Sequence, residues 1–303
     1  SHLDMVPQKN ADVVHDFTKD PIQPYIDGEW VKARSTTLGA DNGIGCAMMM
    51  AVLEDNLLEH PPIEALFTVN EEVGMDGAFG LQKGFLSGTV MLNLDTEEEG
   101  DLCVGCAGGT DVNVTFQFKP DEEIDKGDVA FKISLTGLKG GHSGTQIHLG
   151  HANANKLMNR FLKDVVRNYE ARLASIQGGS LRNAIPRESF AVITIPEQLS
   201  DDLVDLVSEY ESLFREEFSG IENGISFKAE KTDLPKSLLP IEVQDDLINA
   251  VEGCPNGVIS MLAEFPGVVE SSLNLALVHS TEGQIDVKLL VRSSSESRKE
   301  WVC

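Results

Sequence analysis

The sequence is poor in the features that mark several common classes of protein. Basic residues are scarce: 24 Lys and Arg stand against 49 Asp and Glu, which gives a formal net charge of −25. A nucleic acid or an anionic membrane surface would repel such a chain, so we expect neither as a partner. No run approaches the roughly 20 apolar residues that span a bilayer, and no signal-peptide pattern opens the sequence. We therefore expect a soluble, cytoplasmic protein that binds metal ions and small cationic or zwitterionic molecules.

Cysteine is also scarce. The five Cys are odd in number and scattered, which argues against a disulfide framework and predicts reduced thiols. Cys103 and Cys106 have the C-x-x-C spacing of zinc knuckles and redox sites, but no second pair accompanies them. We predict that both are small buried residues. The acidic run DTEEEGD, which begins at Asp95, lacks the alternating ligands of a calcium loop and is expected to be solvated.

What remains is the composition of a globular protein. Hydrophobic residues make up 41% of the 303, enough for a sizeable core in one large or two ordinary domains. In the first hundred or so residues, strand-like and helical patterns alternate: LDMV, IEALFTV and TVMLNLD resemble strands, and NGIGCAMMMAVLEDNLLEH resembles a helix. This order predicts an α/β metal-binding domain with a mostly parallel sheet over residues 1–110.

Beyond residue 110 the pattern changes to that of an α+β domain. DVNVTFQFKP, VAFKISLTG and SFAVITIP alternate apolar and polar residues, as half-buried strands do. Two amphipathic helices are predicted, with apolar faces formed by Leu157, Met158, Phe161, Leu162, Val165, Val166 and Tyr169, and by Leu203, Leu206, Val207, Tyr210, Leu213 and Phe214. A hairpin is expected to turn at Glu282 and Gly283. Residues 111–303 should therefore form a lid with an antiparallel sheet and helices on one face.

Candidate metal ligands gather where the predicted strands end. The stretch TVNEEVGMDG carries the adjacent carboxylates of Glu71 and Glu72 into a glycine turn, and three other stretches, SHLDMV, LGADNGIG and LNLDTEEEG, offer His2, Asp4, Asp41 and Asp95. Taken singly, these motifs are compatible with a solvated turn or an ordinary strand. Adjacent, partly buried carboxylates repel one another, so a cation should lie nearby. One imidazole among several carboxylates suits a pair of zinc or manganese ions better than one structural zinc.

Six segments carry a resemblance to a known family: HLDMVPQKN, DFTKDPIQPYIDGEWVKARSTTLGADNGIG, NEEVGMDGAFGL, LNLDTEEEGDLCVGCAGG, GLKGGHSG and LRNAIPRE. They closely resemble the aminoacyl-histidine dipeptidases, which are carnosinase-like members of the co-catalytic zinc aminoacylase and carboxypeptidase superfamily. The resemblance is dense from residue 2 to about residue 190 and looser beyond. It implies hydrolysis of Xaa-His dipeptides such as β-alanyl-histidine. It also implies two Zn²⁺ per active site, with Mn²⁺ or Co²⁺ as substitutes, and a homodimer formed through the lid domain.

The resemblance implies a role for each metal ligand. His2 and Asp95 would hold one metal, Asp41 would bridge both metals, and Glu72 would bind the second. The peptide bond between Asp41 and Asn42 would be cis.

Four further residues receive roles from the same resemblance. Glu71 would be the general base, and Asp4 would accept the other ring N–H of His2 and so fix its tautomer. His142 in GGHSG would reach a neighbouring subunit's site and stabilise the oxyanion, and Asn183 in RNAIP would contact substrate. Taken without the resemblance, each motif has an ordinary structural explanation that fits it equally well. His142 can be a loop histidine that caps a strand, and Asn183 can be a turn residue before a proline. No ligand role is expected for the remaining histidines: His15, His60, His148, His151 and His279.

The family pattern extends beyond both ends of this sequence. Members carry a helix and strands before the ligand-bearing strand, and a final metal-binding histidine in a C-terminal segment that returns to the first domain. Two explanations are open: the sequence is that of a fragment, or these parts lie outside the given sequence. The metal of His2, Asp41 and Asp95 would keep every protein ligand, but the second metal would have only Asp41 and Glu72. Two alternatives stay open: another peptidase or deacylase of the superfamily (tripeptidase, carboxypeptidase or aminoacylase), or a truncated, non-catalytic binding or dimerisation module.

Overall fold

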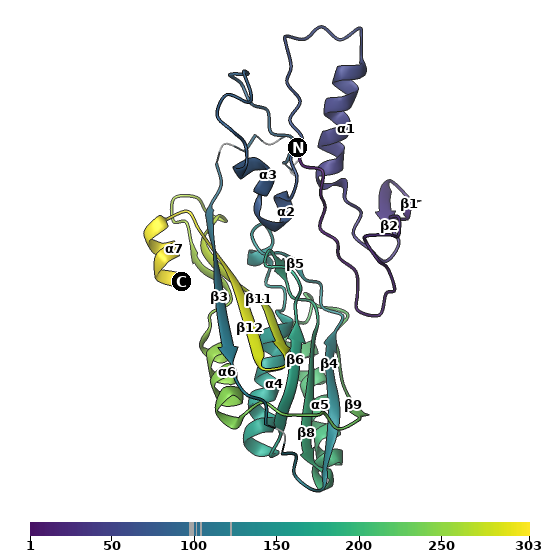
Figure 1. Cartoon of the computed structure of the whole chain (residues 1–303), viewed down its shortest axis with the longest axis vertical. Coiled ribbons are helices and arrows are strands. Elements are labelled where there is room, and N and C mark those ends of the chain that lie inside the picture. The colour runs from purple at the N-terminus through teal and green to yellow at the C-terminus, as the bar shows by residue number, and fades with distance from the viewer. Residues whose placement is uncertain (97–99, 101, 104, 122) are drawn as a thin grey trace. The chain divides into compact units, whose positions relative to one another are not determined.

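The computed structural model describes residues 1–96, 100, 102, 103, 105–121 and 123–303 (Figure 1). Tertiary contacts divide the chain into two units, Ser1–Val104 and Gly105–Cys303. The assignment of residues 1–110 to a metal-binding domain and of residues 111–303 to a lid stays a prediction. Within the acidic run, positions 97–99 and 101 lie outside the described residues.

The first unit contains short regular elements joined by long connections. They are the antiparallel pair β1 (Pro24–Asp27) and β2 (Trp30–Ala33), and the helices α1 (Ala40–Glu54), α2 (Glu71–Gly74) and α3 (Asp76–Phe79). The helix predicted over NGIGCAMMMAVLEDNLLEH is confirmed by α1 as far as Glu54, but residues 55–60 of the predicted segment are not helical.

The parallel sheet predicted for this unit is not confirmed. Among the described residues, the parallel pairing is a single bridge between His2 and Thr68, supported by a 3.0 Å hydrogen bond from the Thr68 N–H to the Ser1 carbonyl. The run TVMLNLD forms no ladder, and the side chains of Met91 and Leu92 are 83% and 82% exposed. Parallel strands are stabilised by layers that cover both faces, and this run has no such cover.

The second unit is built on an eight-stranded antiparallel sheet with the order β3-β12-β11-β6-β8-β4-β9, in which β10 also pairs with β11. The strands are β3 (Gly108–Gln117), β4 (Asp128–Thr136), β6 (Arg172–Gly178), β8 (Ser189–Pro196), β9 (Ser226–Thr232), β10 (Gly257–Met261), β11 (Val269–Thr281) and β12 (Gln284–Ser293). A separate antiparallel pair joins β5 (Gly141–His142) to β7 (Ala184–Ile185). The predicted antiparallel sheet is therefore confirmed, as is the hairpin turn between β11 and β12.

Helices α4 (Ala154–Asn168), α5 (Ser200–Glu217) and α6 (Ile241–Gly253) cover one face of this sheet (Figure 1). Helix α7 (Glu296–Val302) packs on β3 and β12, and the 3₁₀ turns are η1 (Ile147–Leu149) and η2 (Glu197–Leu199). The side chain of Asn153 caps α4 by accepting the N–H groups of Asn155 and Lys156. Phe161 of α4 is fully buried in the core between helices and sheet.

Two sequence predictions are wrong at particular residues. Leu213, assigned to the buried face of α5, is 36% exposed, whereas Leu203 and Phe214 on that face are fully buried. Cys103 and Cys106 are exposed rather than buried. Small residues next to a glycine turn can be accommodated at the surface, and the C-x-x-C spacing says nothing about burial. No helix in the described part of the chain is long and apolar enough to cross a membrane.

Candidate active site

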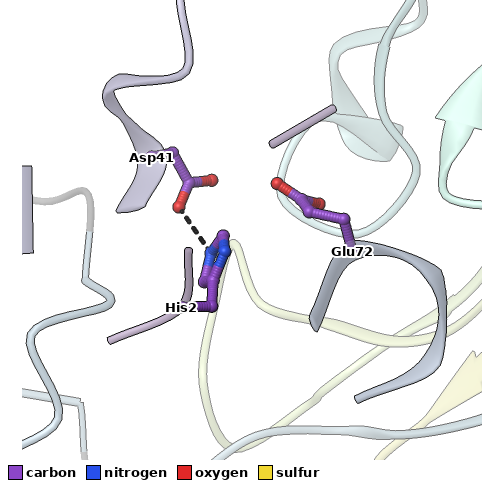
Figure 2. A group of neighbouring side chains, drawn as sticks. All are labelled: His2, Asp41 and Glu72. Carbon is purple, nitrogen blue, oxygen red and sulfur yellow. Dashed lines mark hydrogen bonds and ion pairs between the residues drawn. The ribbon is translucent and has the colours of Figure 1, made fainter. Parts of the chain in front are cut away.

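Three potential metal ligands from distant parts of the sequence meet in the first unit. One ligand atom from each of His2, Asp41 and Glu72 lies within 4.8 Å of the other two. Figure 2 shows the imidazole and both carboxylates turned toward one another, with a hydrogen bond between His2 and Asp41. His2 is 2% exposed, so this histidine is buried against carboxylates rather than against apolar side chains alone.

The spacing of these atoms fits a zinc ion. Nε2 of His2 lies 3.2 Å from Oδ1 of Asp41 and 3.5 Å from Oδ1 of Asp95. Two ligands that each lie about 2.1 Å from a tetrahedral Zn²⁺ are about 3.4 Å apart. Nε2 of His2 can therefore bind one ion together with either carboxylate oxygen with little movement. Both His2 and Asp41 also belong to the group that contains Glu72.

A glycine in α1 allows the ligand-bearing segments to approach each other. A Cβ atom on Gly45 would lie 2.5 Å from Oγ of Ser1 and 2.9 Å from the carbonyl oxygen of Leu94. Both are closer than real Cβ contacts. Because Ser1 and Leu94 directly precede His2 and Asp95, the absence of a side chain at Gly45 lets both ligands lie beside the helix.

Asn42 is a site residue that the sequence patterns did not single out. Its amide N–H donates a 2.6 Å hydrogen bond to Oδ1 of Asp95, and its side chain is buried. The peptide bond between Asp41 and Asn42 is cis, as the resemblance implied. The amide of Asn42 thus holds the carboxylate of Asp95 next to that of Asp41. The signal for its importance was its place directly after the candidate bridging residue.

Asp4 contacts both the histidine and the glutamate pair. Nδ1 of His2 lies 2.9 Å from the backbone oxygen of Asp4 and 3.4 Å from its Oδ1, so the backbone oxygen is the nearer acceptor for the ring N–H. The carboxylate oxygens of Asp4 accept hydrogen bonds from the backbone N–H groups of Glu71 and Glu72, both at 3.1 Å. Asp4 therefore orients the turn that presents the two glutamates as well as His2.

The cluster carries more negative charge than its own cations balance. Burial, followed by the charges of Asp41 and Glu71, raises the pKa of Glu72 to about 7. Burial likewise raises the pKa of Glu71 and that of Asp95, although the proximity of His2 opposes both shifts. Burial alone would lower the pKa of His2, but the surrounding negative charges, led by Asp95, hold it above its usual value. A divalent cation would relieve this repulsion, so the electrostatics and the spacing agree.

Two further predicted residues lie side by side in the second unit. His142 in β5 pairs with Ala184 in β7, and the Ser143 N–H donates a 2.7 Å hydrogen bond to the carbonyl of Asn183. The GGHSG and RNAIP motifs, which are separate in the sequence, are therefore joined by backbone hydrogen bonds.

The ring of His142 is held in a defined tautomer by its own loop. Nδ1 accepts hydrogen bonds from the backbone N–H groups of Thr145 at 3.1 Å and Gly144 at 3.3 Å. Because Nδ1 is the acceptor, the neutral imidazole carries its proton on Nε2. A Cβ atom on Gly144 would lie 3.1 Å from Cε1 of His142 and 3.2 Å from Cζ of Arg292, so the guanidinium of Arg292 flanks the same glycine.

Comparison with known proteins gives matches along the whole chain. The chain is 48% identical over 302 residues to the cytosol non-specific dipeptidase of Escherichia coli (strain K12). It matches the crystal structure of the aminoacylhistidine dipeptidase from Vibrio alginolyticus with 48% identity and a TM-score of 0.69 over 99% of this chain. The chain is similar to these dipeptidases throughout its length.

The matches cover all of this chain but only part of each relative. Residues 133–222 match the peptidase dimerisation domain, which places that domain in the sheet and helices of the second unit. The chain spans 62% of the length of the E. coli relative and 61% of the V. alginolyticus chain, about three fifths of each. The structural match and the dimerisation domain confirm the α+β part of the predicted fold class, with its antiparallel sheet, whereas the parallel sheet of the α/β domain is not confirmed.

Proposed function

We propose that the protein is a metallo-dipeptidase that hydrolyses Xaa-His dipeptides such as β-alanyl-histidine. The observation that carries the proposal is the convergence of His2, Asp41 and Glu72 at ligand spacing, with Asp95 3.5 Å from the same imidazole nitrogen. A cluster of this kind in a chain 48% identical to dipeptidases is best explained as their metal centre.

Two Zn²⁺ ions are the proposed cofactor. His2 and Asp95 would hold one, Glu72 would hold the second, and Asp41 would be a ligand of both; Mn²⁺ or Co²⁺ would suit the same nitrogen and oxygen donors. When bound, the ions supply positive charge that polarises the scissile carbonyl and lowers the pKa of water at the site.

Glu71 is the proposed general base. Its Oε2 lies 3.9 Å from Nε2 of His2, so the carboxylate faces the ligand cluster without being its closest member. Burial raises the pKa of Glu71, which makes it a stronger base once it has lost its proton. Glu71 takes a proton from the attacking water, whose oxygen bonds to the carbonyl carbon. It delivers that proton to the nitrogen of the departing histidine as the C–N bond breaks, so that no proton is lost or gained over the reaction.

The second unit supplies the groups that bind substrate and stabilise developing charge. With its proton on Nε2, His142 can donate a hydrogen bond to the oxyanion that forms on the attacked carbonyl. Asn183, which adjoins it, contacts the substrate backbone.

The same proposal includes a homodimer and a cytoplasmic location. The match of residues 133–222 to a peptidase dimerisation domain supports a dimer formed through the lid, in which His142 serves the partner's site. The E. coli relative is named as a cytosol enzyme, which supports the cytoplasm as the location.

Metal content and turnover of two variants test the proposal. We expect Glu71→Ala to abolish turnover while bound zinc stays largely intact, and Asp41→Ala to lose both ions because it removes the bridging ligand. Equal metal loss in the two variants would identify Glu71 as a ligand. Faster hydrolysis of N-acyl amino acids than of β-alanyl-histidine would favour a deacylase of the same superfamily. About one ion or fewer per chain, with no hydrolysis at saturating zinc, would favour a non-catalytic module.

A further inference from the structure

A buried carboxylate outside the metal centre has two unusual hydrogen-bond partners. Glu222, in the turn between α5 and β9, is 4% exposed. Its Oε2 accepts a 2.8 Å hydrogen bond from the Lys139 N–H, and its Oε1 accepts a 3.0 Å bond from the Ala152 N–H. Burying a carboxylate is unfavourable unless its oxygens are satisfied, so these backbone bonds are what hold Glu222 inside the protein.

The two donors lie at the ends of the segment that carries His142. We call residues 139–152 the histidine loop. Inside it, the His142 N–H donates to Oε1 of Gln146 at 2.8 Å, and Nδ1 of His151 lies 2.5 Å from the carbonyl oxygen of Gly140. Glu222 therefore links both ends of the histidine loop through one carboxylate, and the bonds within the loop connect its interior to those ends.

Two glycines bring Glu222 to this position. A Cβ atom on Gly137, whose φ is +80°, would lie 1.9 Å from the carbonyl oxygen of Gly224, and a Cβ atom on Gly224 would lie 2.6 Å from the carbonyl oxygen of Gly137. The backbones of the two turns are thus in direct contact. Because Gly137 follows β4 and precedes the histidine loop, this contact places the carboxylate of Glu222 against the backbone of the loop.

We propose that Glu222 is a positioning residue that fixes the backbone of the histidine loop and thereby the location and Nε2–H tautomer of the His142 ring. The inference rests on the proposed function only for its catalytic consequence. The ring is oriented by N–H groups of Gly144 and Thr145, which belong to the loop that Glu222 ties down. If the loop shifts, the ring loses these bonds and its proton is no longer confined to Nε2.

The direct test uses Glu222→Gln in the full chain, with Glu216→Gln, an exposed glutamate of α5, as the matched control. Glutamine keeps the volume but presents an amide N–H₂ to one of the two donors, so one hydrogen bond is lost. We expect amide exchange at Lys139 or Ala152 to accelerate by about tenfold or more. We also expect the ¹⁵N shifts of the His142 ring to move from the Nε2–H tautomer toward a mixture. Unchanged exchange and unchanged ring shifts in Glu222→Gln would overturn the proposal.

A double-mutant cycle tests the catalytic consequence. We expect Glu222→Gln to lower kcat on the order of 10- to 100-fold, with KM changed by less than about twofold, because a misplaced donor weakens the transition state rather than the substrate complex. In the His142→Ala background, Glu222→Gln should have no further effect, since the group that it positions is gone. An equal loss in both backgrounds would show that Glu222 acts elsewhere and would overturn the proposal.

The cycle separates this inference from the proposed function. If His142→Ala leaves kcat unchanged, the oxyanion role of His142 is refuted, and the exchange and ring-shift measurements then decide the positioning role by themselves. If His142→Ala lowers kcat but Glu222→Gln does not, the role of His142 stands and the positioning role of Glu222 is refuted.

Discussion

Zinc binding to this chain should release protons, with Glu72 as a principal source near neutral pH. In the metal-free protein, burial and the charges of Asp41 and Glu71 raise the pKa of Glu72 to about 7. A carboxyl group ligates a metal only after it has lost its proton. With a pKa of about 7, about nine-tenths of the Glu72 side chains hold a proton at pH 6, half at pH 7 and one-tenth at pH 8.

The sign of the pH dependence follows from the raised pKa. Protons compete with the metal wherever the neutral carboxyl group predominates, which is below about pH 7. Affinity for the ion that Glu72 holds should therefore fall by up to about tenfold for each pH unit below 7, and should level off above pH 8. His2, whose pKa is also raised, adds to the release in the same direction.

Calorimetric titration of Zn²⁺ in two buffers with different ionisation enthalpies measures the proton release. Compared with Glu72→Gln, the unsubstituted chain should release about 0.9 more protons at pH 6, about 0.5 more at pH 7 and about 0.1 more at pH 8. Glu54→Gln, at an exposed glutamate of α1, should behave as the unsubstituted chain does. The same release from Glu72→Gln at all three pH values would refute the assignment of Glu72 as a titrating ligand.

Three other predictions concern single residues. Glu71→Gln should lower kcat by about 10² to 10⁴ with bound zinc unchanged, because a general base is lost and a ligand is not; kcat and metal analysis of one preparation check this. Asp4→Asn should weaken zinc binding by about 10- to 100-fold, because asparagine offers one acceptor oxygen in place of two to the backbone N–H groups of the glutamate turn. Competition with a chelating dye measures the change. Phe161→Ala should lower the free energy of unfolding of the second unit by about 3 to 5 kcal/mol in urea denaturation followed by circular dichroism. Phe265→Ala, at a ring that is 61% exposed, should change it by less than about 0.5 kcal/mol.

Periodicity was sufficient where an element has one buried and one solvated face. The face of α4 that carries Leu157 and Phe161 is buried as predicted, and the hairpin of β11 and β12 turns at the expected residues. Periodicity was insufficient to predict β9, whose sequence SFKAEKT is mostly polar. That strand is at an edge of the sheet and exists because β4 offers it a ladder of backbone hydrogen bonds, which no local pattern reveals.

In the first unit, the sequence pattern predicts strands that the structure does not form. The runs around Ile63 and Met91 have the composition of buried strands, but strand formation depends on neighbouring strands and on layers that cover the side chains. Composition indicates a tendency to form strands, but tertiary contacts decide whether the strands form. The parallel sheet of this unit consequently stays a prediction.

The sequence by itself determined the antiparallel sheet of the second unit, helix α1 as far as Glu54 and the set of candidate ligands, because residue type and local spacing carry that information. Only the tertiary structure decided how those residues are used: Asp4 bonds to the glutamate turn, Asn42 holds Asp95, and Glu222 closes the histidine loop. These are hydrogen bonds between segments that lie far apart in the sequence, and their partners are set by where one backbone can approach another. The spacing of residues along the sequence does not show which backbone segments come close together. The glycines that permit the close contacts, such as Gly45 and Gly137, are recognised only in the folded structure.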